Sequence, residues 1–251
     1  MKIASCSLLS KLLVICFMLF IGLSSCGEDE EDNFDDNNTE SSFCFEFSQS
    51  TAPYDTVVGG EELTDYNEDQ IYEIDLGFTF DYCDTSFQTL FLAYGHYVMS
   101  FTYEHIDGIN IFNNYNVALF GDIIIQPNGD EDFTGILVKT TGAAGNKITT
   151  IEYRNFMFHD ADFGYHHFSG QVKFYEDENK ITFHYGPNDV DVDFDSDGFN
   201  QFLVGLSGSN DLTSALFLSE NPISPTILSG FTLNDELNTW PVEGTVYTFY
   251  Q

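Results

Sequence analysis

Residues Asn146–Gly186 have the sequence NKITTIEYRNFMFHDADFGYHHFSGQVKFYEDENKITFHYG. Apolar and polar side chains alternate in parts of this stretch, and polar residues separate those parts. Val172 and Phe174 fall on the same face of a strand, because successive strand residues point to opposite faces. Lys173 and Tyr175 fall on the other face. The pattern predicts neighbouring antiparallel strands, the last two joined as a hairpin: Lys147–Phe158, Phe168–Glu176 and Lys180–Tyr185.

Similar runs, bounded by Gly, Pro and Asn, recur along the rest of the chain. Aromatic residues make up 16% of the sequence, with 26 Phe and 14 Tyr, which favours half-buried pleated surfaces. The sequence therefore predicts an all-β domain at residues 43–251, an antiparallel two-sheet sandwich of jelly-roll-like type. The other expected strands are Phe43–Gln49, Ile71–Asp81, Phe87–Ala93, Tyr97–Tyr103, Val117–Gln126, Thr134–Thr141, Gln201–Gly208, Ser214–Leu218, Gly230–Leu233 and Thr245–Tyr250.

The chain carries a formal net charge of −34, from 41 acidic and 7 basic residues. This charge repels nucleic-acid phosphates and anionic membrane surfaces, which excludes nucleic acid as a partner. Cations are the natural small partners of such a surface. The simpler interpretation is that solvated carboxylates keep an exported protein soluble.

The N-terminus predicts export. Basic residues precede the apolar run Leu12–Leu23, which is too short for a permanent transmembrane helix but typical of a signal peptide. The run ends in Leu23-Ser24-Ser25-Cys26, and here the chain resembles bacterial lipoprotein precursors. The resemblance implies that a signal peptide at 1–25 is removed and that Cys26 is lipidated. The alternative is an ordinary signal peptide followed by a chance cysteine.

The segment 26–42 is expected to be the lipidated cysteine and a linker. Gly27–Ser42 contains eight acidic residues, no basic residue and one aromatic residue, so it cannot bury enough apolar surface to fold. It is predicted to be a disordered acidic tether to the membrane. Acidic residues directly after a lipidated cysteine also resemble the signal that sends some lipoproteins to the exterior face of the outer membrane. The alternative is a plain linker that like charges extend.

The predicted domain contains two cysteines, Cys44 and Cys83. An even pair in an oxidising compartment predicts a disulfide, here between the first strand and the end of the second. The alternative is a pair of free thiols that pack as small apolar groups.

The order of strand segments resembles a β-sandwich module of large secreted bacterial surface proteins, many of them exported by type IX secretion. It is distantly similar to the nidogen-type extracellular domain. The resemblance implies recognition or surface structure and offers no catalytic residues. In the pattern of that family, Tyr153 occupies a position that is usually Trp. Asp122 occupies the position of a solvent-facing Asp, and Lys147 that of a basic residue before the long strand. The matching segments are YEIDLGFTFDYCDTSFQTLFLAYGHYVMSF, VALFGDI, ITTIEYRNFMF, FSGQVKFYEDENKITFHYG and WPVEGTVYTF.

The best local motif for chemistry is an acidic run of alternate Asp residues ending at Gly198. Alternate carboxylates followed by Gly resemble the first half of a calcium loop, because several oxygens converge on one hard cation. Val204 stands where the bidentate Glu of such a loop is expected, so upstream Asp189 and Asp191 are further candidates. The alternative is a solvated acidic loop. The candidate calcium ligands are Asp193, Asp195, Asp197 and Asn200.

Other clusters favour a structural interpretation. Gly129–Asp132 forms a second acidic turn that serves as a strand connection, with a metal site as the less favoured alternative. His184 is expected at the surface, on the polar face of the hairpin. Trp240 is the single Trp, which disfavours an aromatic sugar-binding platform. A group that could be drawn as a zinc site matches no known ligand spacing and fits a polar loop better: His159, Asp160, Asp162, His166 and His167.

No nucleophile elbow, zinc-protease motif, P-loop or dinucleotide fingerprint occurs in the sequence. We therefore expect a non-catalytic, surface-anchored lipoprotein that binds an extracellular glycan or protein through its β-sandwich, with calcium as a candidate stabilising ion. The alternatives are a secreted glycan-acting hydrolase, since a carboxylate pair is defined by its spatial separation, and a purely structural envelope protein.

Overall fold

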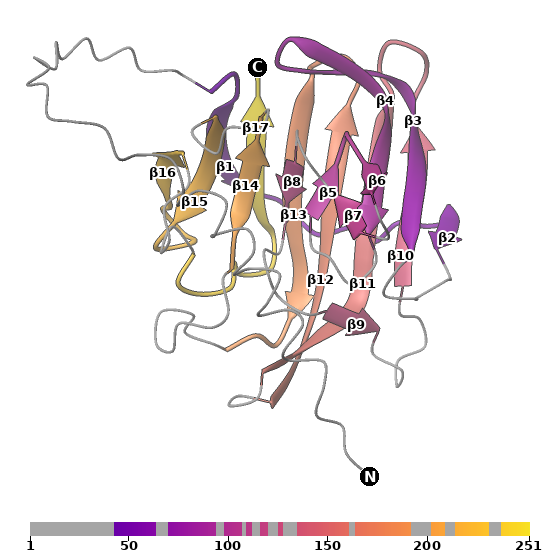
Figure 1. Cartoon of the computed structure of the whole chain (residues 1–251). Coiled ribbons are helices and arrows are strands. Elements are labelled where there is room, and N and C mark those ends of the chain that lie inside the picture. The colour runs from indigo at the N-terminus through magenta and orange to yellow at the C-terminus, as the bar shows by residue number, and fades with distance from the viewer. Residues whose placement is uncertain are drawn as a thin grey trace, which may run out of the picture. The chain divides into compact units, whose positions relative to one another are not determined.

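The computed structural model of the protein describes residues 43–63, 70–93, 98–106, 109–111, 116–119, 125–127, 135–160, 164–191, 202–208, 214–230 and 237–251. These residues form strands joined by turns and loops (Figure 1). The strands are β1 (Glu46–Thr51), β2 (Glu61–Leu63), β3 (Ile71–Tyr82), β4 (Thr85–Ala93), β5 (Val98–Ser100), β6 (Glu104–Ile106), β7 (Ile109–Ile111), β8 (Asn116–Ala118), β9 (Ile125–Pro127), β10 (Gly135–Thr141), β11 (Ile148–Asp160), β12 (Gly164–Tyr175), β13 (Lys180–Asn188), β14 (Val204–Ser207), β15 (Ala215–Ser219), β16 (Thr226–Ser229) and β17 (Thr245–Tyr250).

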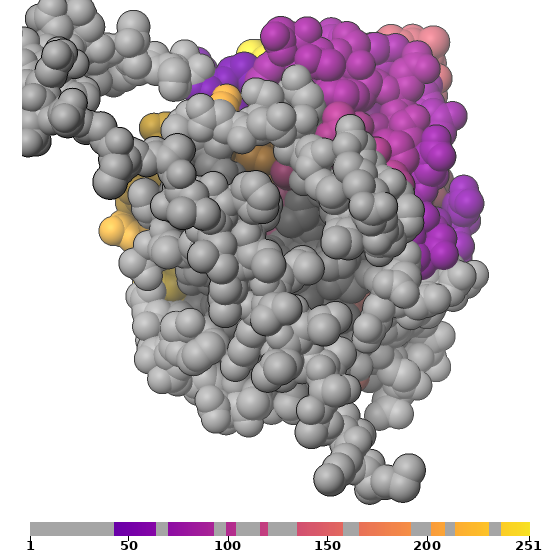
Figure 2. All heavy atoms as spheres, viewed as in Figure 1, coloured from indigo at the N-terminus to yellow at the C-terminus, as the bar shows by residue number. Residues whose placement is uncertain are grey.

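The strands build two antiparallel sheets. The large sheet has the order β1-β17-β13-β12-β11-β10-β2, and β9 also pairs with β11. The small sheet has the order β16-β15-β14-β8-β5-β4-β3, and β6 pairs with β7 as a separate ribbon. In Figure 2 the residues of β3 and β4 form the upper right of the viewed surface. The prediction of an all-β antiparallel sandwich is confirmed.

The predicted three-strand unit lies in the large sheet. Tyr175 pairs with Lys180 across the turn at 176–179, which confirms the hairpin. The long strand β11 pairs with β12, and the register shifts where Asn155 adopts a positive φ of 53°. The backbone N–H of Asn155 donates to Ser169 Oγ at 3.1 Å, so the bulge does not leave this amide unpaired.

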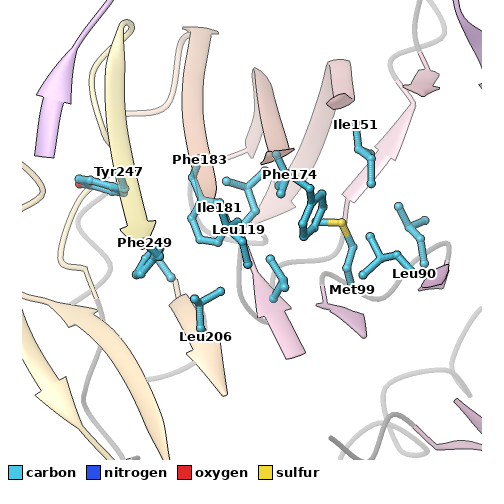
Figure 3. Close-up of a cluster of buried hydrophobic side chains, with 14 of the residues drawn as sticks. Leu90, Met99, Leu119, Ile151, Phe174, Ile181, Phe183, Leu206, Tyr247 and Phe249 are labelled. Carbon is cyan, nitrogen blue, oxygen red and sulfur yellow. The ribbon is translucent and has the colours of Figure 1, made fainter. Parts of the chain in front are cut away.

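The core lies between the two sheets. Figure 3 shows side chains from both sheets, among them Phe174 of β12 and Met99 of β5, that converge in this space. Phe174 is fully buried, and its ring lies edge-on at 5.5 Å from Phe80 and 5.7 Å from Phe101. The alternation in the hairpin therefore marks the core correctly, because its apolar positions face the small sheet.

Polar contacts also connect the two sheets. The hydroxyl of Tyr185, a fully buried residue of β13, donates to the carbonyl of Leu119 at 3.0 Å. Thr149 of β11 donates to the carbonyl of Leu76 at 2.6 Å, where β3 bulges. These bonds satisfy buried hydroxyl groups that would otherwise destabilise the core.

The predicted disulfide between Cys44 and Cys83 is present, with a Cα–Cα distance of 5.4 Å. It joins the residues just before β1 in the large sheet to the β3–β4 turn of the small sheet. The strands β1 and β17 also pair along their whole length, from Glu46 opposite Tyr250 to Thr51 opposite Thr245. The two ends of the domain are thus held together at one edge of the large sheet.

Some predicted strands are wrong in detail. The expected strand Val117–Gln126 is two strands, because β8 pairs in the small sheet whereas β9 pairs in the large one. The first strand begins at Glu46 instead of Phe43. Strand β16 was not predicted, and of the expected strand Gly230–Leu233 only Gly230 is described, outside a strand. The short strands β2, β6 and β7 carry too few residues for an alternating pattern to indicate them.

Candidate functional site

A segment without regular secondary structure crosses the outer face of the large sheet. This segment, Ala52–Gly60, is named the strap; it connects β1 and β2, which are the two opposite edges of that sheet. Six steps between neighbouring strands separate these edges, a distance of about 29 Å at about 4.8 Å per step. Ten residue steps of extended chain reach about 34 Å. The strap must therefore run nearly straight, as the violet trace behind the strands in Figure 1 shows.

The first half of the strap rests on β13 and β17. Ala52 donates its N–H to Gly244 at 2.9 Å and accepts a hydrogen bond from His184 Nε2 at 3.2 Å. The Tyr54 ring lies against Gly186, where an added Cβ would come within 2.7 Å of the ring. Only glycine leaves room for the tyrosine at this position.

A buried carboxylate holds the middle of the strap. Glu152 of β11 is fully buried, and its Oε1 accepts hydrogen bonds from Tyr54 OH at 3.1 Å and Gln171 Nε2 at 3.0 Å. Its Oε2 accepts one from the backbone N–H of Val57 at 3.1 Å and one from Arg154 Nη2. Both carboxylate oxygens are thus satisfied, and an ion pair with Arg154 compensates the buried charge.

Further bonds continue this contact along the strap. Gln171 Nε2 also donates to the carbonyl of Asp55 at 2.7 Å, and Arg154 Nη2 donates to the carbonyl of Val57 at 2.7 Å. Lys139 Nζ donates to the carbonyl of Val58. Burial first, and then the Glu152 charge and hydrogen bond, raise the pKa of Tyr54 well above its usual value. Tyr54 therefore stays a neutral donor.

Beside the strap the outer face is hollowed. A groove of about 220 Å³ lies between strap residues 55–58 and five side chains of the sheet. Lys139, Thr150 and Lys173 lie side by side in it, because Lys139 pairs with Thr150 and Thr150 with Lys173 in the strand register. Two lysines thus flank Thr150, which carries a hydroxyl group, in one cross-strand row. The five side chains are Lys139, Thr141, Thr150, Gln171 and Lys173.

The groove contains two positively charged side chains, which are rare in this acidic chain. After Lys11 the sequence has only five basic residues, all between positions 139 and 180. Arg154 is paired with Glu152, and Lys180 Nζ lies 2.7 Å from Glu178 and over the Tyr175 ring. Burial lowers the pKa of Lys173, whereas the carboxylates of Asp55 and Glu152 act in the opposite direction.

The predicted calcium ligands Asp193, Asp195, Asp197 and Asn200 lie outside the described residues. Upstream of them, Asp189 is described, and its two carboxylate oxygens accept hydrogen bonds from the backbone N–H and, at 3.0 Å, the Nδ1 of His167. Burial alone would raise the pKa of Asp189, but these His167 bonds outweigh it and lower the pKa.

The other predicted positions differ in outcome. Cys26, Asp122, Gly129–Asp132 and Asp162 lie outside the described residues, as do the side chains of His159 and Asp160. Among the residues that are described, no three His, Cys, Asp or Glu side chains form a group that could hold a metal ion. Trp240 is 5% exposed and stacks on Phe202 at 4.6 Å between ring centroids, so it belongs to the core.

The prediction that His184 lies at the surface is wrong. The alternation places it on the outer face correctly, but the strap covers that face and leaves His184 only 5% exposed. Burial lowers the pKa of its imidazole, against a smaller opposite effect of the Ala52 hydrogen bond. The sequence offered one signal for this face, the confinement of all basic residues of the domain to 139–180.

The described residues contain no helix long and apolar enough to cross a membrane. No curated protein and no solved structure matched the chain. One family model did match: the family described as NIDO related covers residues 44–251, which is nearly all of the sandwich domain. This match confirms the resemblance to a nidogen-like module and indicates an extracellular β-rich module. The chain belongs to the NIDO-related family.

Proposed function

We propose that this protein is a non-catalytic, surface-anchored lipoprotein whose sandwich domain binds an extracellular ligand, a glycan or a protein, on the strap face of the large sheet. The observation that carries the proposal is the groove beside the strap, a polar recess with two lysines in a strongly acidic chain. Membership of the NIDO-related family supports it, since that is not a known enzyme family.

A glycan and protein binding array with the full chain tests the binding function. We expect at least one class of extracellular ligand to be retained. A blank array would favour a purely structural envelope protein instead. Hydrolysis of glycans in an activity screen would contradict the non-catalytic part of the proposal and favour the glycan-acting hydrolase.

The anchor is proposed from the sequence alone. Cys26 lies at the end of a signal-like apolar run, and several acyl chains on one residue hold a protein firmly on a membrane. We expect wild-type protein in the outer-membrane fraction, accessible to protease added outside the cell, and Cys26→Ala protein released from membranes. Retention of Cys26→Ala on membranes would contradict lipid anchoring, while Cys16→Ala serves as a control within the signal.

Calcium is proposed as a stabilising ion at Asp193, Asp195, Asp197 and Asn200. Dense like charges repel unless a cation lies between them, and a ligand that binds only the folded state stabilises it by about 2.7 kcal/mol at a hundredfold excess over Kd. We expect the melting temperature to fall when a chelator replaces excess calcium, and Asp193→Asn with Asp195→Asn to abolish that difference. An unchanged melting temperature in the wild type would remove calcium from the proposal.

A further inference from the structure

We propose that the groove beside the strap binds a uronic acid unit of an extracellular acidic glycan, that is, a sugar ring with a carboxylate next to hydroxyl groups. This inference rests on the proposed ligand-binding function and names the ligand class of the same site. The two lysines, the buried amide of Gln171 and the size of the groove support it.

The lysines supply the anion-binding part. Lys139 and Lys173 flank Thr150 in one cross-strand row, so their ammonium groups are held on the same side of the sheet. Lys139 donates to the carbonyl of Val58, which steadies its ammonium at the edge of the groove. Within the described part of the chain, Lys173 has no hydrogen bond, and the carboxylates of Asp55 and Glu152 offset only part of its burial, which still lowers its pKa. A half-buried ammonium is costly, and a carboxylate hydrogen-bonded to it would compensate the remaining cost.

Gln171 supplies a second and independent indication. It is fully buried and lines the groove, and its Nε2 donates to Asp55 and Glu152. Its Oε1 atom has no hydrogen-bond partner among the described residues. Turning the amide over would place this oxygen against two acceptors, so the orientation is fixed by the network. The buried oxygen therefore lacks a donor, a deficit that costs stability until a donor arrives.

The two requirements together select the ligand class. The lysines need an acceptor with negative charge, and Gln171, which lines the same recess of about 220 Å³, has a buried oxygen that needs a donor. An isolated sulfate or phosphodiester group offers acceptors but carries no hydroxyl donor of its own. An acidic peptide side chain carries a carboxylate but no hydroxyl group beside it. A uronic acid carries both groups on one compact ring, and Thr141 and Thr150 add hydroxyls that both donate and accept.

The net charge of the chain does not oppose this contact. The formal charge is −34, but charges farther than about 8 Å are largely screened at physiological ionic strength. The groove lysines act at contact distance, where screening is weak. Two lysines and one carboxylate, Asp55, line the groove, so its local charge is positive in an otherwise acidic chain.

The test is a calorimetric titration of the full chain in nonionic detergent with D-galacturonate, D-galactose and sulfate. Galactose has CH2OH in place of the carboxylate, and sulfate has the charge without a hydroxyl donor. We expect galacturonate to bind at least tenfold more tightly than either. Equal affinity for galactose, equal affinity for sulfate, or no galacturonate binding at millimolar concentration would each overturn the inference.

Variants locate the binding. Lys173→Gln is expected to lower galacturonate affinity at least tenfold, and Lys173→Arg to restore part of it. Lys180→Gln removes one charge from the same sheet outside the groove and should change affinity less than twofold. Melting temperatures show whether each variant is folded. Equal losses in Lys173→Gln and Lys180→Gln would show a general charge effect and overturn the inference.

The same variants separate this inference from the function on which it rests. If the array identifies a ligand that wild type and Lys173→Gln bind equally, the binding function stands and the groove is not its site. If the chain binds neither an array ligand nor galacturonate, both fail.

Discussion

The two faces of the large sheet are both buried, but by different means. On the inner face, Val172 and Phe174 are covered by the small sheet and are held by apolar contact. On the outer face, Glu152, Gln171 and His184 form one cross-strand row and are covered by the strap. Apolar burial is non-directional, whereas the outer row depends on hydrogen bonds with defined partners.

This difference sets what each face tolerates. The inner face can exchange one apolar side chain for another of similar volume at modest cost. The outer face needs its donors and acceptors to match, because an unpaired buried polar group costs about 1 to 3 kcal/mol. The strap also has little slack between the two sheet edges, so its contacts are fixed in register with the sheet below. Non-directional apolar contacts and directional polar contacts thus stabilise opposite faces of the same strands.

The largest expected effect is on the inner face. Phe174→Ala removes a fully buried ring that contacts Phe80 and Phe101, and should lower the free energy of unfolding by about 3 to 5 kcal/mol. Tyr175→Ala, one residue along on the outer face, is the matched control and should cost less than about 1 kcal/mol. Urea unfolding of both variants measures the difference. Equal losses would show that the faces are not energetically distinct.

The next effect is on the outer face. Glu152→Gln keeps the side-chain shape but removes the charge opposite Arg154 and replaces one acceptor with a donor. We expect a loss of about 2 to 3 kcal/mol in unfolding free energy and faster hydrogen exchange at the Val57 amide. Exchange at amides of β12 should change less. Unaltered exchange at Val57 would contradict the role of Glu152 in holding the strap.

A smaller effect is expected at the strap itself. Tyr54→Phe keeps the ring on Gly186 but removes one of the donors to Glu152. Because other donors remain on the carboxylate, the loss should be about 1 kcal/mol. A double-mutant cycle with Glu152→Gln measures the coupling between the two side chains. Additive losses would show that this hydrogen bond contributes nothing to strap closure.

The sequence predicted the inner face well, for a physical reason. Alternation has a period of two, so Val172 and Phe174 had to share one face, and Ile181 joins them because it pairs with Phe174 across the hairpin; all three are fully buried. The hairpin turn also fixes the register of β12 and β13, which places Gln171 opposite His184. The Cys44–Cys83 disulfide was predicted from the even number of cysteines in the domain and from the expected export to an oxidising compartment.

The outer face could not be predicted in the same way. The strap has no periodic pattern, and its path depends on β1 and β2 lying at opposite edges, which is a property of the sheet order. The neighbourhood of Glu152 and Gln171 depends on the β11–β12 register, which the sequence between these strands does not specify. Predicting the groove would have required both the sheet order and the β11–β12 register. Only the confinement of basic residues to 139–180 was visible beforehand.

The smallest expected effect concerns pH and His184. Burial under the strap lowers the pKa of its imidazole, so the folded state holds it neutral while the unfolded state takes up a proton near its ordinary pKa. Its contribution to stability is therefore present above the unfolded pKa and is lost as the pH falls through the folded pKa. The unfolding free energies of wild type and His184→Gln should differ more at pH 8 than at pH 5. The carboxylates are common to both proteins and cancel in this difference. If the difference in unfolding free energy between the two proteins instead grew as the pH fell, the imidazole would be charged beneath the strap. The outer face would then accommodate a buried charge, which the apolar inner face cannot do.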